Sequence, residues 1–247
     1  MQLSLPGAPH LTYCTNIHAG ESWAEIEAAL LAHLPRIKAE VSPQSPMGVG
    51  LRLSGSAARD LSDAATRARF KRFLAGGGFY VFTVNAFPYG SFHGQRVKER
   101  VYEPDWRSLE RLRFTNEVAD LLDDIAPPGL AASISTVPGA FGAKAATQDA
   151  VAEIADGFVR AAAHLHDIHR RRGRSIVLAI EPEPACLLET TADAVRFFED
   201  YLFAVPARAR FAEMTGVSVS EAEGALRRHL GLCFDVCHSA VAFEETA

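Results

Sequence analysis

Cysteine is scarce in this chain of 247 residues. The four copies, Cys14, Cys186, Cys233 and Cys237, are widely scattered, which is typical of reduced thiols in a cytoplasm and argues against a disulfide framework. No apolar run approaches the roughly 20 residues that a membrane helix needs. The opening stretch MQLSLPGAPH also lacks the basic and apolar regions of a secretory signal. We therefore expect a cytoplasmic protein with no membrane insertion.

An excess of basic charge is also missing. The net charge is −5 and no basic stripe stands out, so we expect no nucleic-acid partner. The chain is 48% hydrophobic, which is enough for one large core, and no stretch resembles a linker or an internal repeat. Residues 1–247 are therefore expected to form a single domain.

Short apolar runs alternate with longer segments of helical periodicity. The runs are flanked by Gly, Pro or Ser and are rich in β-branched and aromatic residues, so they predict strands. The predicted strands cover residues 10–17, 47–53, 79–87, 131–137, 175–181 and 230–236. Strand–helix alternation at this spacing predicts an α/β fold with a parallel sheet and right-handed crossovers.

The intervening segments carry recognisable helix signals. Residues 21–41 place one apolar stripe at steps of three and four, formed by Trp23, Ile26, Leu30, Leu34 and Ile37. The segment 147–173 ends on basic residues and Gly173, as helices commonly do. In the last predicted helix, Ser218 and Glu221 are spaced as a capping box and Gly231 is the expected stop.

Two architectures fit this alternation: an open doubly wound sheet and a (β/α)8 barrel. No G-x-G-x-x-G motif follows the first predicted strand, where a dinucleotide-binding fold would carry it. Polar residues follow nearly every predicted strand instead, as in a barrel whose carboxyl-end loops build one site. The barrel is therefore favoured, although the sequence predicts six strands rather than eight.

The stretch IEPEP places two glutamates at the end of the fifth predicted strand. Glu181 ends an apolar run, and prolines on both sides of Glu183 restrict the backbone. Carboxylates two residues apart on an extended chain point the same way, and a cation or a shared proton would relieve their repulsion. The alternative is a solvated pair of loop glutamates.

Asp235 follows the apolar run LGLCF and precedes His238 by three residues. A buried carboxylate is costly unless it is paired or bound to metal. Carboxylates suit Mg²⁺ or Mn²⁺, and an added imidazole admits Zn²⁺, Co²⁺ or iron. Two alternatives remain for this segment: Asp235 as a helix N-cap or loop residue, and zinc ligation by Cys233, Cys237 and His238. The second lacks a C-x-x-C knuckle, so the cysteines are expected to form core or wall.

Other strand ends supply candidate substrate contacts. Asn16 and His18 follow the first predicted strand, Arg52 ends the second, Asn85 ends the third, and His93 lies in the loop after it. The histidines of HLHDIH, residues 164–169, lack the spacing of a zinc helix and are expected on an exposed face.

Several motifs together resemble a known family. The stretches LTYCTNIH, FPYG, SISTVPGAF, EPEP and CFDVCH are similar to those of the EboE-like metabolite-traffic branch of the xylose-isomerase-like TIM-barrel superfamily, across essentially the whole chain. This resemblance implies a (β/α)8 barrel that binds a divalent metal, either Mn, Mg, Co or Zn. It implies metal ligation by Glu181 or Glu183 and by Asp235, with His238 on metal or substrate and Glu189 facing the substrate. In such relatives the remaining ligands come from strands seven and eight, so the chain is expected to lack its last two βα units.

The function implied by the resemblance is metal-dependent isomerisation or epimerisation of a small polyhydroxylated metabolite. Glu181, Glu183 and His238 are the expected catalytic residues, and Asn16, His18, Arg52, Asn85, His93 and Glu189 are the expected substrate contacts. The resemblance places this reaction within an ebo-type secondary-metabolite pathway and implies association with other ebo-cluster proteins. The alternative is a non-catalytic metabolite-binding or trafficking protein that keeps the barrel pocket. A phosphodiester-cleaving relative is disfavoured by the acidic charge balance.

Overall fold

A computed structural model of the chain describes residues 1–90, 98–145 and 147–245. Its sheet has six strands, each paired in parallel with the next along the chain. The strands are β1 (Thr12–Cys14), β2 (Met47–Arg52), β3 (Phe79–Asn85), β4 (Ala132–Thr136), β5 (Ile176–Ile180) and β6 (Leu230–Leu232). This is the strand order of six consecutive barrel units, and it confirms the predicted α/β class. Within the described residues, β1 pairs only with β2, and β6 pairs only with β5.

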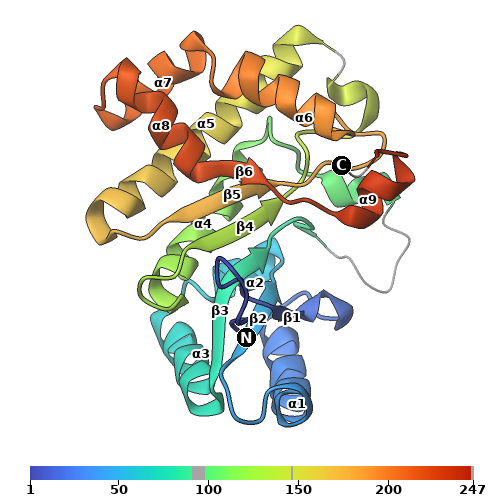
Figure 1. The fold of residues 1–247 in the computed structure, drawn as a ribbon, viewed down its shortest axis with the longest axis vertical. Helices are drawn as coiled ribbons and strands as arrows, with labels where there is room; N and C mark the ends of the chain where they lie inside the picture. Colours follow the sequence, from blue (N-terminus) through green and yellow to red (C-terminus); the bar gives the residue numbers. More distant parts are fainter. Residues whose placement is uncertain (91–97, 146, 246–247) are drawn as a thin grey trace.

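Helices connect the parallel strands, because a parallel pair cannot be joined by a tight hairpin. They are α1 (Trp23–Val41), α2 (Gly55–Asp60), α3 (Ala64–Gly77), α4 (Leu109–Ile125), α5 (Gln148–Arg172), α6 (Thr191–Phe197), α7 (Val205–Thr215), α8 (Val219–His229) and α9 (Val236–Val241). Shorter turns are η1 (Thr15–Ile17), η2 (Lys98–Tyr102), η3 (Gly142–Ala145) and the π-helical η4 (Phe198–Leu202). Figure 1 shows α1 and α3 beside β1–β3, and α5, α7 and α8 beside β4–β6.

Local sequence signals explain where the helices begin and end. Ser22 and Glu25 form a reciprocal capping box at the start of α1, and Ser218 and Glu221 form the predicted one at the start of α8. Gly173 ends α5 in the left-handed conformation (φ 70°), which favours glycine because it has no Cβ. The α1 stripe is also confirmed, because four of its five residues are buried and Ile37 is partly buried.

The core lies between the sheet and the surrounding helices. Leu51, Val81, Ile134 and Leu178 come from four successive strands and are fully buried. Burial of one such side chain contributes roughly 1.5–3 kcal/mol. This packed layer holds the strands in register, so their carboxyl ends meet at one edge of the sheet.

Three sequence predictions about the carboxyl-terminal part are wrong. The sixth strand ends at Leu232 rather than at residue 236, and Gly231 lies within β6, opposite Ala179, instead of ending a helix. The helix α9 follows the one that the sequence predicted as last, because the Asp235 side chain accepts a hydrogen bond from Cys237 N (2.7 Å) and caps a new helix.

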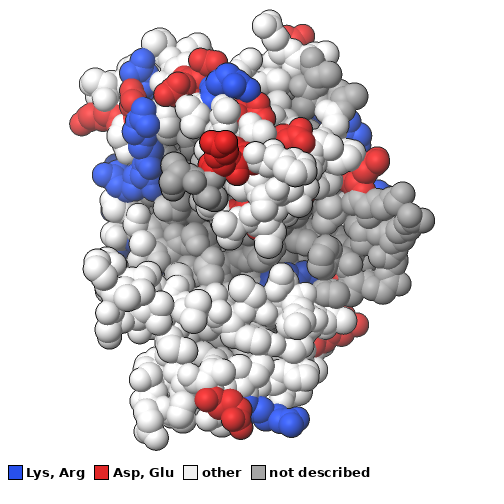
Figure 2. Space-filling model, turned by 45° about the vertical axis from the view of Figure 1, so that its right-hand side comes forward, with Lys and Arg blue, Asp and Glu red and all other residues white. Residues whose placement is uncertain are grey.

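The surface carries charges of both signs. Figure 2 shows acidic and basic side chains interspersed over the upper part of one face. None of the helices in the described part of the chain has the length and the apolar composition needed to cross a bilayer.

Candidate functional site

A cavity of about 190 Å³ opens where the carboxyl ends of several strands meet. It is lined by Asn16, Arg52, Asn85, Phe87, Pro88, Val101, Glu181 and Glu183. Five of these residues were predicted as site residues from the positions of the strand ends. They come from the ends of β1, β2, β3 and β5, which are far apart in sequence. The barrel-like strand order therefore brings them together as expected.

Arg52 forms one wall of this cavity from a buried position. Its side chain is 2% exposed, and its guanidinium donates to Glu21 Oε2 (2.8 Å) and to the Gly20 carbonyl oxygen. Its backbone N–H donates to Thr15 Oγ1 (2.9 Å). These contacts hold the arginine in one orientation at the edge of the cavity.

Three side chains beside the cavity could hold a metal ion: Glu181, Asp235 and His238. One donor atom from each lies within 4.8 Å of the others. Glu181 follows β5 directly, whereas Asp235 is the N-cap of α9 and His238 lies within that short helix. The helix cap thus serves a second purpose, since it places the Asp235 carboxylate and the His238 ring on the same side of the chain.

The hydrogen bonds of His238 determine which ring nitrogen can bind metal. Its Nδ1 lies 3.2 Å from the carbonyl oxygen of Pro182, which can only accept a hydrogen bond. Nδ1 therefore carries the proton when this bond forms, and Nε2 presents a lone pair. That nitrogen lies 3.7 Å from Asp235 Oδ2 and 3.8 Å from Glu183 Oε1.

The electrostatics of the two glutamates favour a bound cation. The pKa of Glu181 is raised to about 7, mainly by burial and to a smaller extent by the negative charge of the neighbouring Glu183. Burial also raises the pKa of Glu183, against the opposing effect of a hydrogen bond from Tyr102. A divalent cation would relieve the cost of burying adjacent negative charges. The two carboxylates and one imidazole of the set Glu181, Asp235 and His238 are ligands that suit Mn²⁺, Co²⁺, Zn²⁺ or iron.

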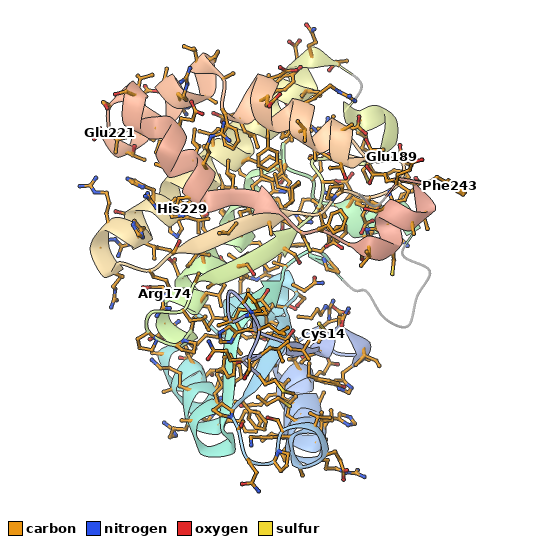
Figure 3. The ribbon with its side chains drawn as sticks, viewed as in Figure 1. Cys14, Arg174, Glu189, Glu221, His229 and Phe243 are labelled. Atoms are coloured by element: carbon orange, nitrogen blue, oxygen red, sulfur yellow. The ribbon has the colours of Figure 1, made fainter. Side chains whose placement is uncertain are left out.

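The remaining predicted site residues lie in different places. Glu189 lines a small recess together with Asp235 and His238, and Figure 3 shows it near α9. His18 does not line the cavity, because its Nε2 pairs with the Tyr13 hydroxyl (2.9 Å) and its ring stacks on His33 (4.2 Å between centroids). His93 lies outside the described residues.

Sequence analysis did not single out Tyr102. Its hydroxyl donates to Glu183 Oε2, and burial raises its pKa, so the hydroxyl keeps its proton at neutral pH. Tyr102 ends the short turn η2 rather than a strand, and neither periodicity nor a strand-end position marks it.

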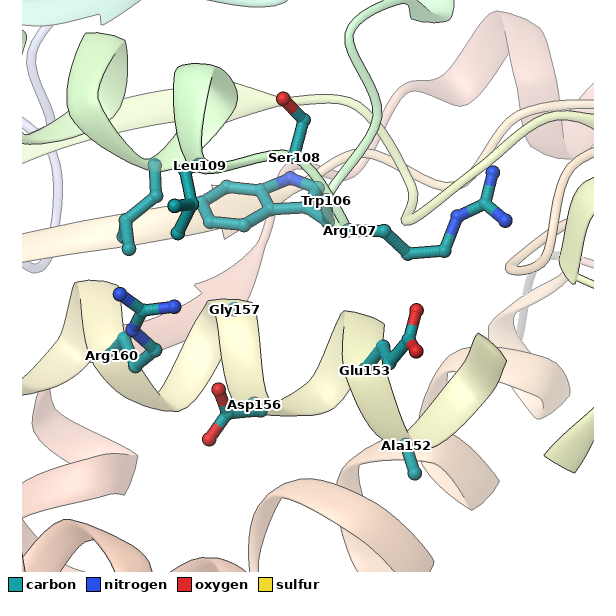
Figure 4. Close-up of a pocket in the computed structure, with 10 residues that line it drawn as sticks. Trp106, Arg107, Ser108, Leu109, Ala152, Glu153, Asp156, Gly157 and Arg160 are labelled. Carbon is teal, nitrogen blue, oxygen red and sulfur yellow. The ribbon is translucent and has the colours of Figure 1, made fainter. Parts of the chain in front are cut away.

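The part of the chain that the structure describes also has a larger cavity, of about 450 Å³, on its helical side (Figure 4). It lies between α5 and the segment that leads into α4, with Trp106, Arg107, Glu153 and Arg160 in its walls. Arg107 is bound to Asp105, and no strand end reaches this cavity. The candidate site is therefore the cavity at the strand ends, beside which the three donor groups converge, and not this larger cavity.

A scan against protein-family models finds no match, and a search of curated proteins finds no relative. Among solved structures, the chain is similar to the IolI protein with a bound zinc atom, with a TM-score of 0.44 and 14% identity over 77% of this chain. It is also similar to the probable 3-DHS dehydratase AsbF, involved in petrobactin synthesis, from Bacillus anthracis, with a TM-score of 0.45 and 14% identity over 90% of this chain. The matches span 59% of the IolI chain and 71% of the AsbF chain, so the chain covers less than two thirds of the first.

Proposed function

We propose that this protein is a divalent-metal-dependent isomerase or epimerase that acts on a small polyhydroxylated metabolite. The observation that carries the proposal is the convergence of Glu181, Asp235 and His238 on one point beside a cavity that Glu183 also lines. The motifs shared with the EboE-like branch of the xylose-isomerase-like superfamily support the same reaction class. A cytoplasmic location, an ebo-type pathway and association with other ebo-cluster proteins belong to the proposal and rest on that resemblance.

In this proposal the residues of the site have three roles: metal binding, proton transfer and contact with the substrate. Glu181, Asp235 and His238 hold the ion, which when bound polarises neighbouring substrate oxygens and acidifies the adjacent C–H or O–H group. Glu183 takes a proton from the substrate at Oε1, the oxygen that the Tyr102 hydroxyl does not occupy, and returns it at the neighbouring position. The cavity wall formed by Asn16, Arg52 and Asn85 offers groups that hydrogen bond to hydroxyls, and Phe87, Pro88 and Val101 offer apolar surface for C–H groups.

A second candidate is a metabolite-binding or trafficking protein that performs no chemistry. The mixed polar and apolar lining of the cavity favours binding of a small polar molecule, whether or not turnover follows.

The test uses the full chain stripped of metal by a chelator and reloaded with Mn²⁺, Co²⁺ or Zn²⁺. Bound metal is measured by elemental analysis, and proton abstraction is measured by NMR as deuterium exchange into candidate ketoses and polyols in D₂O. We expect one equivalent of metal, exchange in the loaded protein, and loss of exchange with retention of metal in Glu183→Gln. Glu213→Gln, an exposed change on α7, is the matched control.

Two results would count against parts of this proposal. Stoichiometric metal and metabolite binding without any deuterium exchange would favour the trafficking function. Failure of the wild-type chain to retain any of the three metals would overturn the metal-dependent mechanism.

A further inference from the structure

The site contains two glutamates two residues apart, and the fold treats them differently. Glu181 contributes to the converging set of donor atoms with Asp235 and His238, whereas Glu183 does not. The Glu183 backbone is held on both sides, because its N–H donates to the Leu188 carbonyl oxygen (3.0 Å) and its own carbonyl oxygen accepts from Cys186 N (3.2 Å). The position of the Glu183 carboxylate therefore depends on its side-chain rotamer and on the partners of its two oxygens.

Those two oxygens face different neighbours. Oε2 accepts a hydrogen bond from the Tyr102 hydroxyl, and Oε1 lies 3.8 Å from His238 Nε2, the nitrogen that keeps a lone pair when Nδ1 donates to Pro182. Glu183 Oε1 is thus about as near to His238 Nε2 as Asp235 Oδ2 is, at 3.7 Å. The Tyr102 hydroxyl holds the other oxygen of the same carboxylate.

Tyr102 is itself held firmly in place. Its ring stacks on Phe141, with centroids 5.0 Å apart and planes 17° apart, and it meets Phe87 edge-on at 5.6 Å. The tyrosine comes from η2, 81 residues before Glu183 in sequence. A rigid hydroxyl from a distant segment is well suited to hold one rotamer of a carboxylate.

We propose that Tyr102 is a positioning residue that keeps Glu183 off the metal ion and facing the cavity, so that Glu181 alone of the two glutamates becomes a ligand. This inference rests on the proposed metal site. It deepens the proposed function by explaining how neighbouring carboxylates acquire separate roles.

The experiment titrates Co²⁺ into the full metal-free chain and records its visible d–d spectrum, whose intensity falls as coordination number rises. In Tyr102→Phe we expect Glu183 to join the ion, with a weaker d–d absorption and an affinity for Co²⁺ about tenfold tighter. The double variant Tyr102→Phe/Glu183→Gln should return to the wild-type spectrum. Tyr102→Phe retains the ring contacts, and thermal unfolding checks its fold. Tyr13→Phe, which removes a tyrosine hydroxyl that pairs with His18 outside the cavity lining, is the control and should match the wild type.

Each outcome decides between the alternatives. A Tyr102→Phe spectrum and affinity equal to those of the wild type would overturn the positioning role while leaving the metal site intact. Glu183→Gln alone provides an independent test, because an unchanged Co²⁺ spectrum supports the inference and a loss of affinity would show that Glu183 is already a ligand. Failure of the wild-type chain to bind Co²⁺ would instead overturn the proposed function, and the inference with it.

Discussion

The glutamates that follow β5 and the histidines near the start of β6 show two outcomes of burying ionisable groups. Asp235 and His238 lie just after β6, whereas His229 immediately precedes this strand. His229 forms a histidine cluster with His166 and His169, between α5 and α8. Figure 3 shows Glu189 and His229 far apart, on the two sides of this sheet region.

Burial perturbs both regions in the direction expected of each group. It raises the pKa of Glu181 to about 7 and lowers that of His229 to about 4, in each case favouring the neutral form. The pKa of His166 is also lowered, mainly by burial and to a smaller extent by the positive charge of Arg170. The carboxylates converge on a cavity, whereas the imidazoles pack edge-to-face on one another at 5.8–5.9 Å between centroids. A perturbed pKa therefore does not by itself mark a functional site, and the convergence of donor atoms beside a cavity separates the two regions.

The largest expected effect tests the histidine cluster as a purely structural region. Because the folded-state pKa of His229 lies below the value of 6.5 expected when unfolded, the unfolded chain binds the extra proton first. Stability is therefore present above pH 6.5 and lost as the pH falls toward 4, by about 3 kcal/mol. Urea unfolding at pH 7 and pH 4 should show this loss in the wild type and not in His229→Leu.

The control for this measurement is Leu226→Ala, a core change on the same helix. It should lower the free energy of unfolding by about the same amount at both pH values, since it removes no titratable group. Acid sensitivity that persists unchanged in His229→Leu would show that other groups cause it.

The next effect tests the metal-ligand set. Asp235→Asn removes one of the two carboxylates in the set of three donor groups. We expect metal affinity to fall by about 100-fold, the upper end of the range of losses seen when groups that support metal ligands are changed. Isothermal titration with Mn²⁺ or Co²⁺ provides the measurement. Asp167→Asn, an exposed helical change, should bind as the wild type does. Equal affinity in both variants would leave Asp235 as a helix cap alone.

A smaller effect concerns the pH dependence of the metal-free chain. The folded-state pKa of Glu181 lies above the unfolded value of 4.5, so its contribution to stability is fully present below pH 4.5 and is lost as the pH rises through 7. Compared with Glu181→Gln in chelator, the wild type should lose about 2 kcal/mol of unfolding free energy between pH 5 and pH 8. Saturating metal should abolish the difference. Parallel pH profiles for the two proteins would contradict the burial of this charge.

The smallest effect separates oxygen from sulfur ligation. The pKa of Cys233 is raised to about 12, mainly by burial and to a smaller extent by the negative charges of Glu181 and Asp235. The thiol therefore stays protonated in the metal-free chain. Cys233 is not among the three converging residues. We expect Cys233→Ser to bind Co²⁺ within about twofold of the wild type, and the wild-type complex to show no sulfur-to-cobalt charge-transfer band. Such a band, lost in the variant, would make the thiol a ligand.

The strands and the shared edge at their ends could be predicted because both depend on local patterns. Apolar runs located the strands, and parallel order then required Asn16, Arg52, Asn85 and Glu181 to approach one another. The reading of residues 230–236 as one strand failed at its end, because the Asp235 side chain caps a helix, which was the alternative that the sequence offered for this residue.

Features that depend on tertiary packing could not be predicted. HLHDIH suggested an exposed face, yet His166 is only 7% exposed because α8 brings His229, and α7 brings Phe211, against it. The contact between Tyr102 and Glu183 joins segments 81 residues apart, and no local pattern encodes it.

Three consecutive residues, Glu181, Pro182 and Glu183, each make a different contact in the site. Glu181 supplies a donor atom, the Pro182 oxygen accepts from His238 Nδ1, and Glu183 faces Tyr102. Inserting a single residue into this tripeptide would disturb all three contacts at once, whereas exchanging any one side chain would disturb only its own. A change in the length of the stretch Glu181–Pro182–Glu183 is therefore expected to damage the site more than any single substitution within it.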